Sequence, residues 1–312
     1  MAKCLVVGGN GFLGSHLVDA LVEHGHEVTV YDRFTRGLPQ FESAAVTAVA
    51  ADFTDRESLS QAVRGHDYVF HFLSATTPAS VEQDPVLDIY ANLIPSVELF
   101  RLCAESGVRR LFLASSGGAI YGGDMRRTAS ESYRTHPTSP YAIGKLALEN
   151  YLHYFEATQS LPYTIFRISN PYGPRQSALK RQGLIAIALD RALKGAAVTR
   201  FGSGSMVRDY VYVADLIRMI MNAVDKPGEQ RVYNLGRGEG HTVNDILDSI
   251  SRVTGLELAI TEAAVPRTFV EYSVLDISRY EREYGKTEYT GLDEGIRRTW
   301  MSMRQGAGAA VG

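Results

Sequence analysis

The sequence has few cysteines and almost no excess of charge. Only two of its 312 residues are cysteines, Cys4 and Cys103, so the chain can form at most one disulfide bond. Cys4 opens a predicted core strand, and both cysteines are therefore expected as free thiols in a reducing cytosol. The 35 acidic and 32 basic side chains leave a formal net charge of −3. Such a chain lacks the positive field of a nucleic-acid-binding protein, so no nucleic-acid partner is expected.

The sequence also has no long apolar run near its beginning and no internal repeat. The apolar stretch at 4–7 ends at Gly8, which makes it too short for a signal peptide or a membrane span. We therefore expect a cytoplasmic protein with no membrane partner. The alanine- and glycine-rich residues 305–312 have little to bury and are expected to be a disordered tail. The chain as a whole, with 45% hydrophobic residues, is long enough for one large or two modest domains.

A buried strand, a glycine-rich turn and an amphipathic helix follow one another at the start of the chain. The predicted strand covers 4–7, the helix covers 15–24, and Gly8, Gly11 and Gly14 lie in the turn between them. In this arrangement the first glycine permits a tight turn, the second lets the backbone approach a pyrophosphate, and the third lets the helix pack closely on the strand. The helix N-terminus then offers free N–H groups to the anion. The segment predicts a dinucleotide site.

An acidic residue ends the second predicted strand. That strand covers 27–31 and leads into Asp32, the position where a carboxylate can bind the hydroxyls of the adenine ribose. Because a carboxylate repels a 2′-phosphate, the cofactor predicted here is NAD rather than NADP. Arg33 and Arg36 follow directly, and as cations they leave NADP as an alternative.

Strands and helices continue to alternate through the first half of the chain. Strands are predicted at 46–49, 68–72 and 110–114, and helices at 58–63 and 89–105. The alternation is typical of a parallel sheet with helices on both faces. In such a sheet, ligands bind beyond the carboxyl ends of the strands, where Ser115 and Ser116 follow the third of these strands. His71 is read as a core residue, and no metal site is expected.

The segment Ser139-Pro140-Tyr141-Ala142-Ile143-Gly144-Lys145 opens a predicted helix. Tyr141 and Lys145 fall one turn apart and so share one face. A phenol has a pKa near ~10, and bringing it to neutrality takes roughly 4 kcal/mol, to which a neighbouring ammonium can contribute. Taken alone, such a pair is more often a surface tyrosine and a solvated lysine. With Ser116 over a nicotinamide, however, it makes a proton-transfer site that needs no metal.

Together these features resemble the extended short-chain dehydrogenase/reductases, and within them the NAD-dependent nucleotide-sugar epimerases of the UDP-galactose 4-epimerase type. The resemblance extends from about Lys3 to Trp300. Besides the residues above, it includes Asn92, Tyr121-Gly122 and the segments 167–174, 208–215 and 233–236.

The resemblance implies a role for each matching residue. Tyr141 is the acid/base, Lys145 holds the nicotinamide ribose and lowers the pKa of the tyrosine, and Ser116 binds the sugar oxygen. Ser115 stays an alternative to Ser116, because Gly117 occupies the position where the family usually has its serine or threonine. Substrate contacts are expected from Ser116, Tyr141, Asn170, Arg208 and Arg267. The expected cofactor-binding residues are Gly8, Gly11, Phe12, Leu13, Gly14, Asp32, Arg33, Asp52, Phe53, Phe72, Leu73, Ser74, Asn92, Ser115, Tyr141 and Lys145.

The implied fold is α/β, a doubly wound parallel-sheet Rossmann domain with a smaller α/β lid. Residues 1–170 and 205–240 are assigned to the NAD-binding domain. Residues 171–204 and 241–300 are assigned to the lid that binds a nucleoside diphosphate sugar carrying UDP or dTDP. The stretches 209–223 and 231–235 are expected to return to the nucleotide-binding sheet. Relatives pair through helices corresponding to 92–105 and 141–155, so a homodimer is expected.

The implied reaction is epimerisation of a nucleoside diphosphate hexose, at C4 in the first instance, through a keto sugar. A nucleotide-sugar reductase or dehydrogenase would keep the same motifs. A dehydratase is disfavoured, because residues 117–119 read Gly-Gly-Ala where dehydratases of the family carry acids. A non-enzymatic dinucleotide sensor is disfavoured because the chain keeps both Tyr141 and Lys145.

Overall fold

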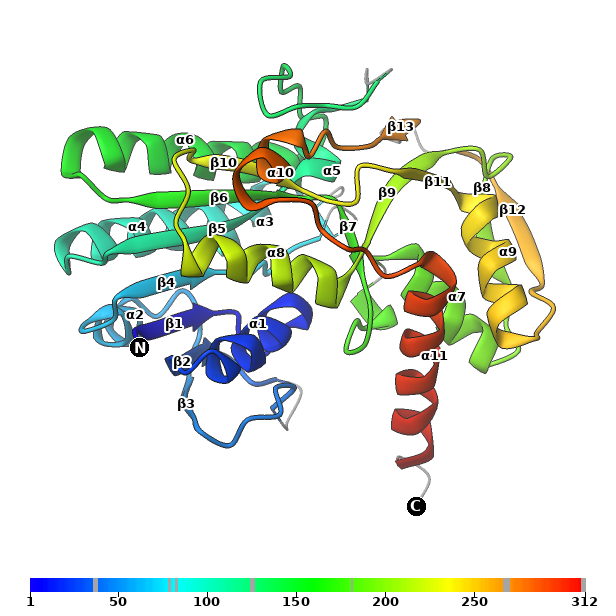
Figure 1. Ribbon diagram of the computed structural model, residues 1–312, viewed down its shortest axis with the longest axis horizontal. Helices are drawn as coiled ribbons and strands as arrows, with labels where there is room; N and C mark the ends of the chain where they lie inside the picture. Colours follow the sequence, from blue (N-terminus) through cyan, green and yellow to red (C-terminus); the bar gives the residue numbers. More distant parts are fainter. Residues whose placement is uncertain are drawn as a thin grey trace. The chain divides into compact units, whose positions relative to one another are not determined.

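The computed structural model describes residues 1–35, 39–77, 80–81, 84–123, 127–180, 182–265 and 270–309 (Figure 1). The chain divides into two compact units. The first unit consists of residues 1–116, 139–167 and 220–233, and the second unit of residues 117–138, 168–219 and 234–312.

The first unit contains most of a sheet of seven strands in the order β10-β6-β5-β4-β1-β2-β3, of which the last residues of β6 and β10 belong to the second unit. The register is parallel, with Val6 of β1 opposite Val30 of β2 on one side and Phe70 of β4 on the other. The strand order reverses between β1 and β4, which is the switch point where doubly wound sheets bind ligands. The strands are β1 Lys3–Val7, β2 Glu27–Asp32, β3 Val46–Ala50, β4 Tyr68–His71, β5 Arg110–Ser116, β6 Tyr163–Ile168 and β10 Val232–Leu235.

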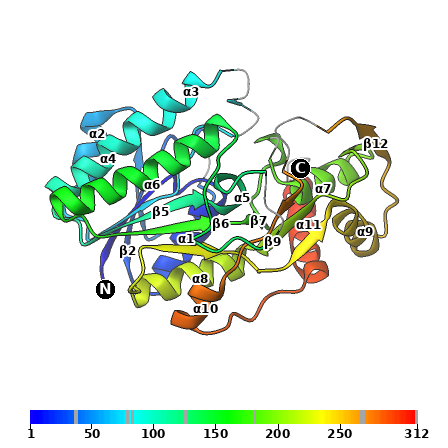
Figure 2. The ribbon, with the colours of Figure 1, turned by 90° about the horizontal axis from the view of Figure 1, so that it is seen from above.

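Helices cover both faces of this sheet. Helix α1 (Phe12–Glu23) lies on one face, and α2 (Arg56–Val63), α4 (Ile94–Glu105) and α6 (Pro140–Gln159) lie side by side on the other, as Figure 2 shows. Helix α6 begins where Ser139 accepts a hydrogen bond from the Ala142 N–H and Pro140 occupies the first turn, a favourable helix start. Leu148, Leu152 and Phe155 on its inner face belong to the core cluster with residues of β1 and β5.

The second unit contains smaller sheets and a group of helices. Strand β9 (Val207–Tyr212) is the centre of a four-stranded sheet with β7 (Asn170–Tyr172), β11 (Gly240–Thr242) and β13 (Tyr272–Ser273). Strands β8 (Val198–Phe201) and β12 (Ile260–Ala263) form a pair. Helices α7 (Leu184–Leu193), α9 (Val243–Thr254) and α11 (Leu292–Ala309) pack against one another (Figure 1). The remaining elements of this unit are α5 Gly117–Ile120, η2 Ala178–Lys180 and α10 Ser278–Tyr284, and α8 Val213–Asp225 begins here and continues into the first unit at Ile220.

The parallel sheet and the alternation of strands and helices confirm the predicted fold class, but three details differ. Only β10 returns to the large sheet, whereas β9 pairs within the second unit, because an apolar strand pattern does not specify its partner. The predicted helix at 89–105 is α3 (Val86–Asp88), a π-helical turn η1 (Ile89–Leu93) and α4. Residues 305–309 continue helix α11, where a disordered tail was predicted.

None of the helices in the described part of the chain combines the length and the apolar content needed to cross a membrane.

Candidate cofactor and catalytic site

The glycine turn after β1 leaves no room for side chains. Gly8 has a φ of +84°, and a Cβ atom there would lie 2.6 Å from the backbone nitrogen of Leu73. A Cβ atom at Gly14 would lie 2.2 Å from the Gly8 carbonyl oxygen, and one at Gly11 would lie 3.1 Å from it. Helix α1 follows directly and presents its N-terminus to this bare turn. The arrangement fits a dinucleotide pyrophosphate, whose charge the free N–H groups of the helix would bind.

The loop after β4 lies directly beside this turn. The Phe72 N–H donates to the Val7 carbonyl oxygen at 2.9 Å, and the Leu73 backbone faces Gly8. Asn92 holds the same loop two residues further on, because its Oδ1 accepts a hydrogen bond from the Ala75 N–H at 2.8 Å. The predicted residues Phe72, Leu73 and Ser74 therefore lie at the switch point of the sheet.

The acidic residue at the end of β2 also lies beside the glycine turn. The Asp32 carboxylate accepts hydrogen bonds from the N–H groups of Asn10 and Phe34, both at 3.1 Å. Arg33 and Asp52 are exposed and form an ion pair at 3.6 Å. Because Arg33 is paired with the Asp52 carboxylate, it would attract the 2′-phosphate of NADP less strongly than an unpaired arginine would. Arg36 lies outside the described residues.

Phe53, three residues beyond the end of β3, is buried. Its side chain is only 4% exposed and packs against the imidazole of His71, with the ring centroids 5.2 Å apart. The ring belongs to the core cluster, and the contact of Phe53 with the cofactor stays a prediction. His71 is buried as well, and its Nε2 lies 2.7 Å from the Ser96 hydroxyl. In the described residues, no group of three or more His, Cys, Asp or Glu side chains is arranged to hold a metal ion.

Tyr141, Lys145 and Ser116 converge where β5 ends and α6 begins. The Lys145 ammonium donates to the Ala114 carbonyl oxygen of β5 at 2.9 Å and lies 5.9 Å from the centroid of the Tyr141 ring. The Ser116 hydroxyl lies close enough to Tyr141 to act on the pKa of the phenol, which it lowers against the larger effect of burial. Because β5 continues through Ser116, successive residues point to opposite sides of the strand.

Ser115 therefore faces away from Tyr141. Its hydroxyl donates to Oε1 of Glu149 at 2.5 Å, and Oε2 of Glu149 lies 2.6 Å from an Arg167 nitrogen. All three side chains are buried, at 5%, 6% and 7% exposure. This network engages Ser115 in the interior and leaves Ser116 as the hydroxyl beside the tyrosine.

Burial dominates the protonation of the two ionisable groups. It raises the pKa of Tyr141 to about 12, opposed by the Ser116 hydroxyl and reinforced by the negative charge of Asp88. Burial lowers the pKa of Lys145 to about 8, although the carboxylates of Asp88 and Glu149 favour the charged form. The protein alone thus holds a neutral phenol beside an ammonium at neutral pH.

Sequence reasoning missed the acidic residues around this pair. Asp88 is 4% exposed, and its Oδ1 accepts hydrogen bonds from Thr76 at 2.5 Å and Asn92 at 2.8 Å. Glu149 follows Lys145 by four residues, a spacing that already indicated a shared helix face. No comparable signal pointed to Asp88, because its position depends on the π-helical turn that follows it.

Two of the predicted substrate residues lie on neighbouring strands of the second unit. Asn170 of β7 is paired in register with Tyr210 of β9, and its side-chain amide donates to the Asp209 carbonyl oxygen at 3.1 Å. Arg208 of β9 donates to the carbonyl oxygens of Val207, at 2.8 Å, and Val270. Burial lowers the pKa of its guanidinium. The third predicted residue, Arg267, lies outside the described residues.

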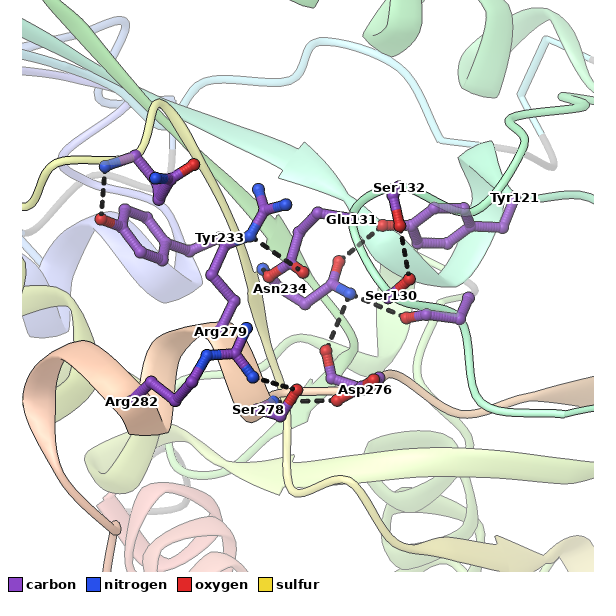
Figure 3. A network of polar contacts seen from close by, with 12 residues as sticks. Tyr121, Ser130, Glu131, Ser132, Tyr233, Asn234, Asp276, Ser278, Arg279 and Arg282 are labelled. Atoms are coloured by element: carbon purple, nitrogen blue, oxygen red, sulfur yellow. Dashed lines mark hydrogen bonds and ion pairs between the residues drawn. The ribbon is translucent and has the colours of Figure 1, made fainter.

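Asn234 anchors the segment that carries the Tyr121-Gly122 motif, as Figure 3 shows. Its Oδ1 accepts a hydrogen bond from the Tyr121 hydroxyl at 2.7 Å, and its Nδ2 donates to the carbonyl oxygens of Ala129 and Asp276 at 2.8 and 3.0 Å. The Asn234 N–H also donates to the Glu131 carboxylate at 2.8 Å. Two motifs far apart in the sequence are thus joined within the second unit.

The sequence and the fold match one family throughout. The sequence model of the "NAD dependent epimerase/dehydratase family" matches residues 4–236. A protein of Methanocaldococcus jannaschii named as a putative UDP-glucose 4-epimerase is 32% identical over 95% of this chain and 97% of its own length. The crystal structure of UDP-glucose 4-epimerase from Thermotoga maritima with UDP-glucose has a TM-score of 0.92 at 34% identity, covering 98% of this chain and 99% of the other.

The structure of Thermus thermophilus UDP-glucose 4-epimerase in complex with NAD has a TM-score of 0.91 at 34% identity, covering 97% of this chain and 99% of the other. Other matching proteins are named for different reactions, including dTDP-glucose 4,6-dehydratase and a UDP-sugar decarboxylase.

Proposed function

The chain belongs to the NAD dependent epimerase/dehydratase family and uses NAD, and we propose that it epimerises a nucleoside diphosphate hexose at C4 through a keto sugar. The observation that carries this proposal is the convergence of Ser116, Tyr141 and Lys145 at the carboxyl edge of the sheet. NAD, when bound, supplies the reversible two-electron oxidation of the sugar carbon. The glycine turn and Asp32 would hold its pyrophosphate and its adenine ribose.

Tyr141 is the proposed acid/base. As a phenolate it takes the proton of the sugar hydroxyl, and as a phenol it returns the proton when the sugar carbon is reduced on its other face. Ser116 orients the sugar oxygen by a hydrogen bond, and Lys145 binds the nicotinamide ribose. Asn170 and Arg208, with Arg267, are the proposed ligands of the substrate pyrophosphate, because charge-assisted donors suit a diphosphate.

The energetics require more than one positive charge near Tyr141. Lowering its pKa from about 12 to neutrality corresponds to roughly 7 kcal/mol. A unit charge at the 5.9 Å that separates Lys145 from the tyrosine ring contributes only about 3 kcal/mol at an effective dielectric constant of about 20. Lys145 alone is therefore insufficient. The positive charge of the bound oxidised cofactor is the second contribution, so Tyr141 becomes a base only in the loaded enzyme.

The main alternatives are a nucleotide-sugar reductase or dehydrogenase and a dehydratase. A reductase or dehydrogenase would use the same three residues. Dehydration needs a further acid/base pair, and residues 117–119, which form most of α5, are Gly-Gly-Ala. This absence of acidic side chains favours the epimerase.

A screen of UDP- and dTDP-hexoses distinguishes these reactions. The proposal predicts interconversion of C4 epimers, read by NMR, with no net change of absorbance at the NADH wavelength. Stoichiometric formation of NADH would instead show a dehydrogenase, and stoichiometric consumption of NADH would show a reductase. Loss of water from the sugar would replace it with a dehydratase. Binding of NAD without turnover of any nucleotide sugar would favour a sensor.

We also propose that the protein is a homodimer in the cytoplasm. Large apolar side chains are exposed on neighbouring elements of the first unit, and an apolar patch of this kind is typical of an interaction surface. They are Val86, Leu87, Ile89, Tyr90 and Ile94 on α3, η1 and α4, and Ile143, Tyr151 and Tyr154 on α6. Light scattering at micromolar concentration should give the mass of two chains. Tyr90→Glu combined with Ile143→Glu should give one chain, and a monomeric native protein would contradict the proposal.

A further inference from the structure

Asp88 is a buried carboxylate that the proposed reaction does not use. It ends α3, directly before the π-helical turn η1, and is 4% exposed. Its Oδ1 accepts hydrogen bonds from the Thr76 hydroxyl and the Asn92 amide, which are both neutral groups. Glu149 differs in this respect, because its charge is matched by the guanidinium of Arg167 at 2.6 Å. When a buried carboxylate is held only by neutral donors, no positive partner cancels its negative charge, and the charge acts on the neighbouring groups.

The second oxygen of Asp88 packs directly on helix α6. A Cβ atom at Gly144 would lie 2.0 Å from Oδ2 and 3.2 Å from Cγ of Asp88, and the nearest atoms to that position all belong to Asp88. Only glycine leaves room for this contact. Gly144 precedes Lys145, so the carboxylate meets the helix backbone within the turn that carries Tyr141 and Lys145.

Asp88 also shares a small cavity with the reactive pair. Its lining includes Asp88, Asn92, Tyr141, Gly144 and Lys145, and its volume is about 10 Å³. A cavity of this size is at the lower limit for a single water molecule. Since little water can screen them there, the charges of Asp88 and Lys145 act on each other and on Tyr141 more strongly than they would in solvent.

We propose that Asp88 is a positioning residue for the proposed catalytic pair: its carboxylate is the counter-charge that keeps Lys145 an ammonium, and its contact with Gly144 fixes α6 against η1 and the loop after β4. The effect of Asp88 on turnover rests on the proposed function. The charge effect and the contact themselves can be measured without turnover.

The other groups that face Lys145 do not replace Asp88. Glu149 on α6, which is paired with Arg167, favours the charged form of Lys145 less than Asp88 does, and Tyr141 on α6 is uncharged in the protein alone. His71 on β4 stays neutral, because burial lowers its pKa to about 3. Removing the charge of Asp88 should therefore make Lys145 lose its proton at lower pH. It should also let Tyr141 ionise at lower pH, because the same carboxylate opposes the phenolate.

The charge effect is tested with Asp88→Asn, which keeps the size of the side chain. Asp84→Asn is the matched control, because it removes an exposed acid four residues earlier in the same segment. The Cε resonance of carbon-13-labelled Lys145, assigned with Lys145→Arg, reports its titration in the absence of substrate. We expect the midpoint to move to lower pH by about one unit in Asp88→Asn and not in Asp84→Asn. An unchanged midpoint in Asp88→Asn would overturn the inference, whether or not the protein is an epimerase.

In the NAD-loaded enzyme, the whole pH profile of turnover should move in the same direction by about one unit. A shift of the Lys145 resonance without turnover of any nucleotide sugar would sustain the role of Asp88 and reject the proposed function.

The contact is tested by a double-mutant cycle with Gly144, which stays informative if Asp88→Asn folds poorly. Gly144→Ala should lower Tm by about 5 °C or more, although alanine normally favours a helix. Adding Asp88→Ala should restore most of the loss, because the atoms nearest to the new methyl group are then removed. Additive losses in the double variant would show that Asp88 does not pack on Gly144.

Discussion

Two of the buried carboxylates, Asp88 of the first unit and Asp209 of the second, are satisfied in different ways. In the second unit, Asp209 accepts hydrogen bonds from the backbone N–H groups of Arg237, Gly238 and Leu275 at 2.8, 3.1 and 3.4 Å. In the first unit, Asp88 is held by two side chains and lies at the cavity shared with Tyr141 and Lys145. The backbone hydrogen bonds of Asp209 fix the loops that donate them. Asp88, which is held by side chains and lies near Lys145, can instead influence the charge of that lysine. The comparison indicates that Asp209 serves the structure of its unit, whereas Asp88 serves the chemistry of the proposed site.

The largest effect is expected from Tyr141→Phe, which removes the proposed acid/base of the first unit. Turnover should fall about 10³-fold, in the range for loss of a positioned general acid or base. Thermal stability and NAD binding should stay close to those of the native protein, because the phenyl ring remains. Steady-state kinetics measures the turnover, and calorimetry measures the thermal stability and the binding of NAD. A variant that keeps more than a tenth of the native rate would remove Tyr141 from the mechanism.

Removing the carboxylate of the second unit should act on stability instead. Asp209→Ala leaves three buried backbone N–H groups without their acceptor and should lower the free energy of unfolding by about 3 kcal/mol. The control is Asp248→Ala, which removes an exposed acid of the same unit and should change it by less than about 0.5 kcal/mol. Denaturant unfolding measures both. Equal losses of unfolding free energy in the two variants would contradict a structural role for Asp209.

Variants of the two adjacent serines at the end of β5 should have different effects, one on turnover and the other on stability. Ser116→Ala should lower turnover by about 10²-fold, because the hydroxyl beside Tyr141 is lost. Ser115→Ala should leave turnover within a few-fold and lower the free energy of unfolding by about 1 kcal/mol, because it removes only the hydrogen bond to Glu149. The reverse pattern would assign the catalytic hydroxyl to Ser115.

The smallest effect is a pH dependence that follows from burial of Lys145. Its pKa is lowered to about 8, so the ammonium is present below that pH and is lost as the pH rises through it. The value of kcat/KM should therefore fall up to tenfold per unit above about pH 8, since this parameter reports ionisations of the free enzyme. In Lys145→Arg the guanidinium stays charged, and this alkaline limb should vanish at a lower absolute rate. An identical limb in the variant would assign it to another group.

Local patterns predicted much of the first unit because they act over short distances in the sequence. The glycine turn, Asp32 and the Tyr141/Lys145 pair depend on a strand, a turn or one helical turn, and each could be placed before the structure was known. Ser116 could not be separated from Ser115, because the distinction depends on β5 extending as far as Ser116.

Features that depend on long-range contacts could not be predicted. The ion pair of Glu149 and Arg167 joins residues 18 positions apart, and the partners of β9 come from 170–172, 240–242 and 272–273. Asp88 depends on a π-helical turn, for which the sequence carried no recognisable signal. The packing of the Phe53 ring on His71 likewise joins residues 18 positions apart.

The most direct test of the proposed chemistry is incubation of the NAD-loaded enzyme with UDP-glucose in D₂O, followed by proton NMR. The account predicts that the C4 epimer forms and that C4 carries no deuterium, because the C4 hydrogen leaves and returns with its electron pair while Tyr141 moves only the hydroxyl proton. Deuterium at C4 of the product, or conversion to any product other than the C4 epimer, would contradict it.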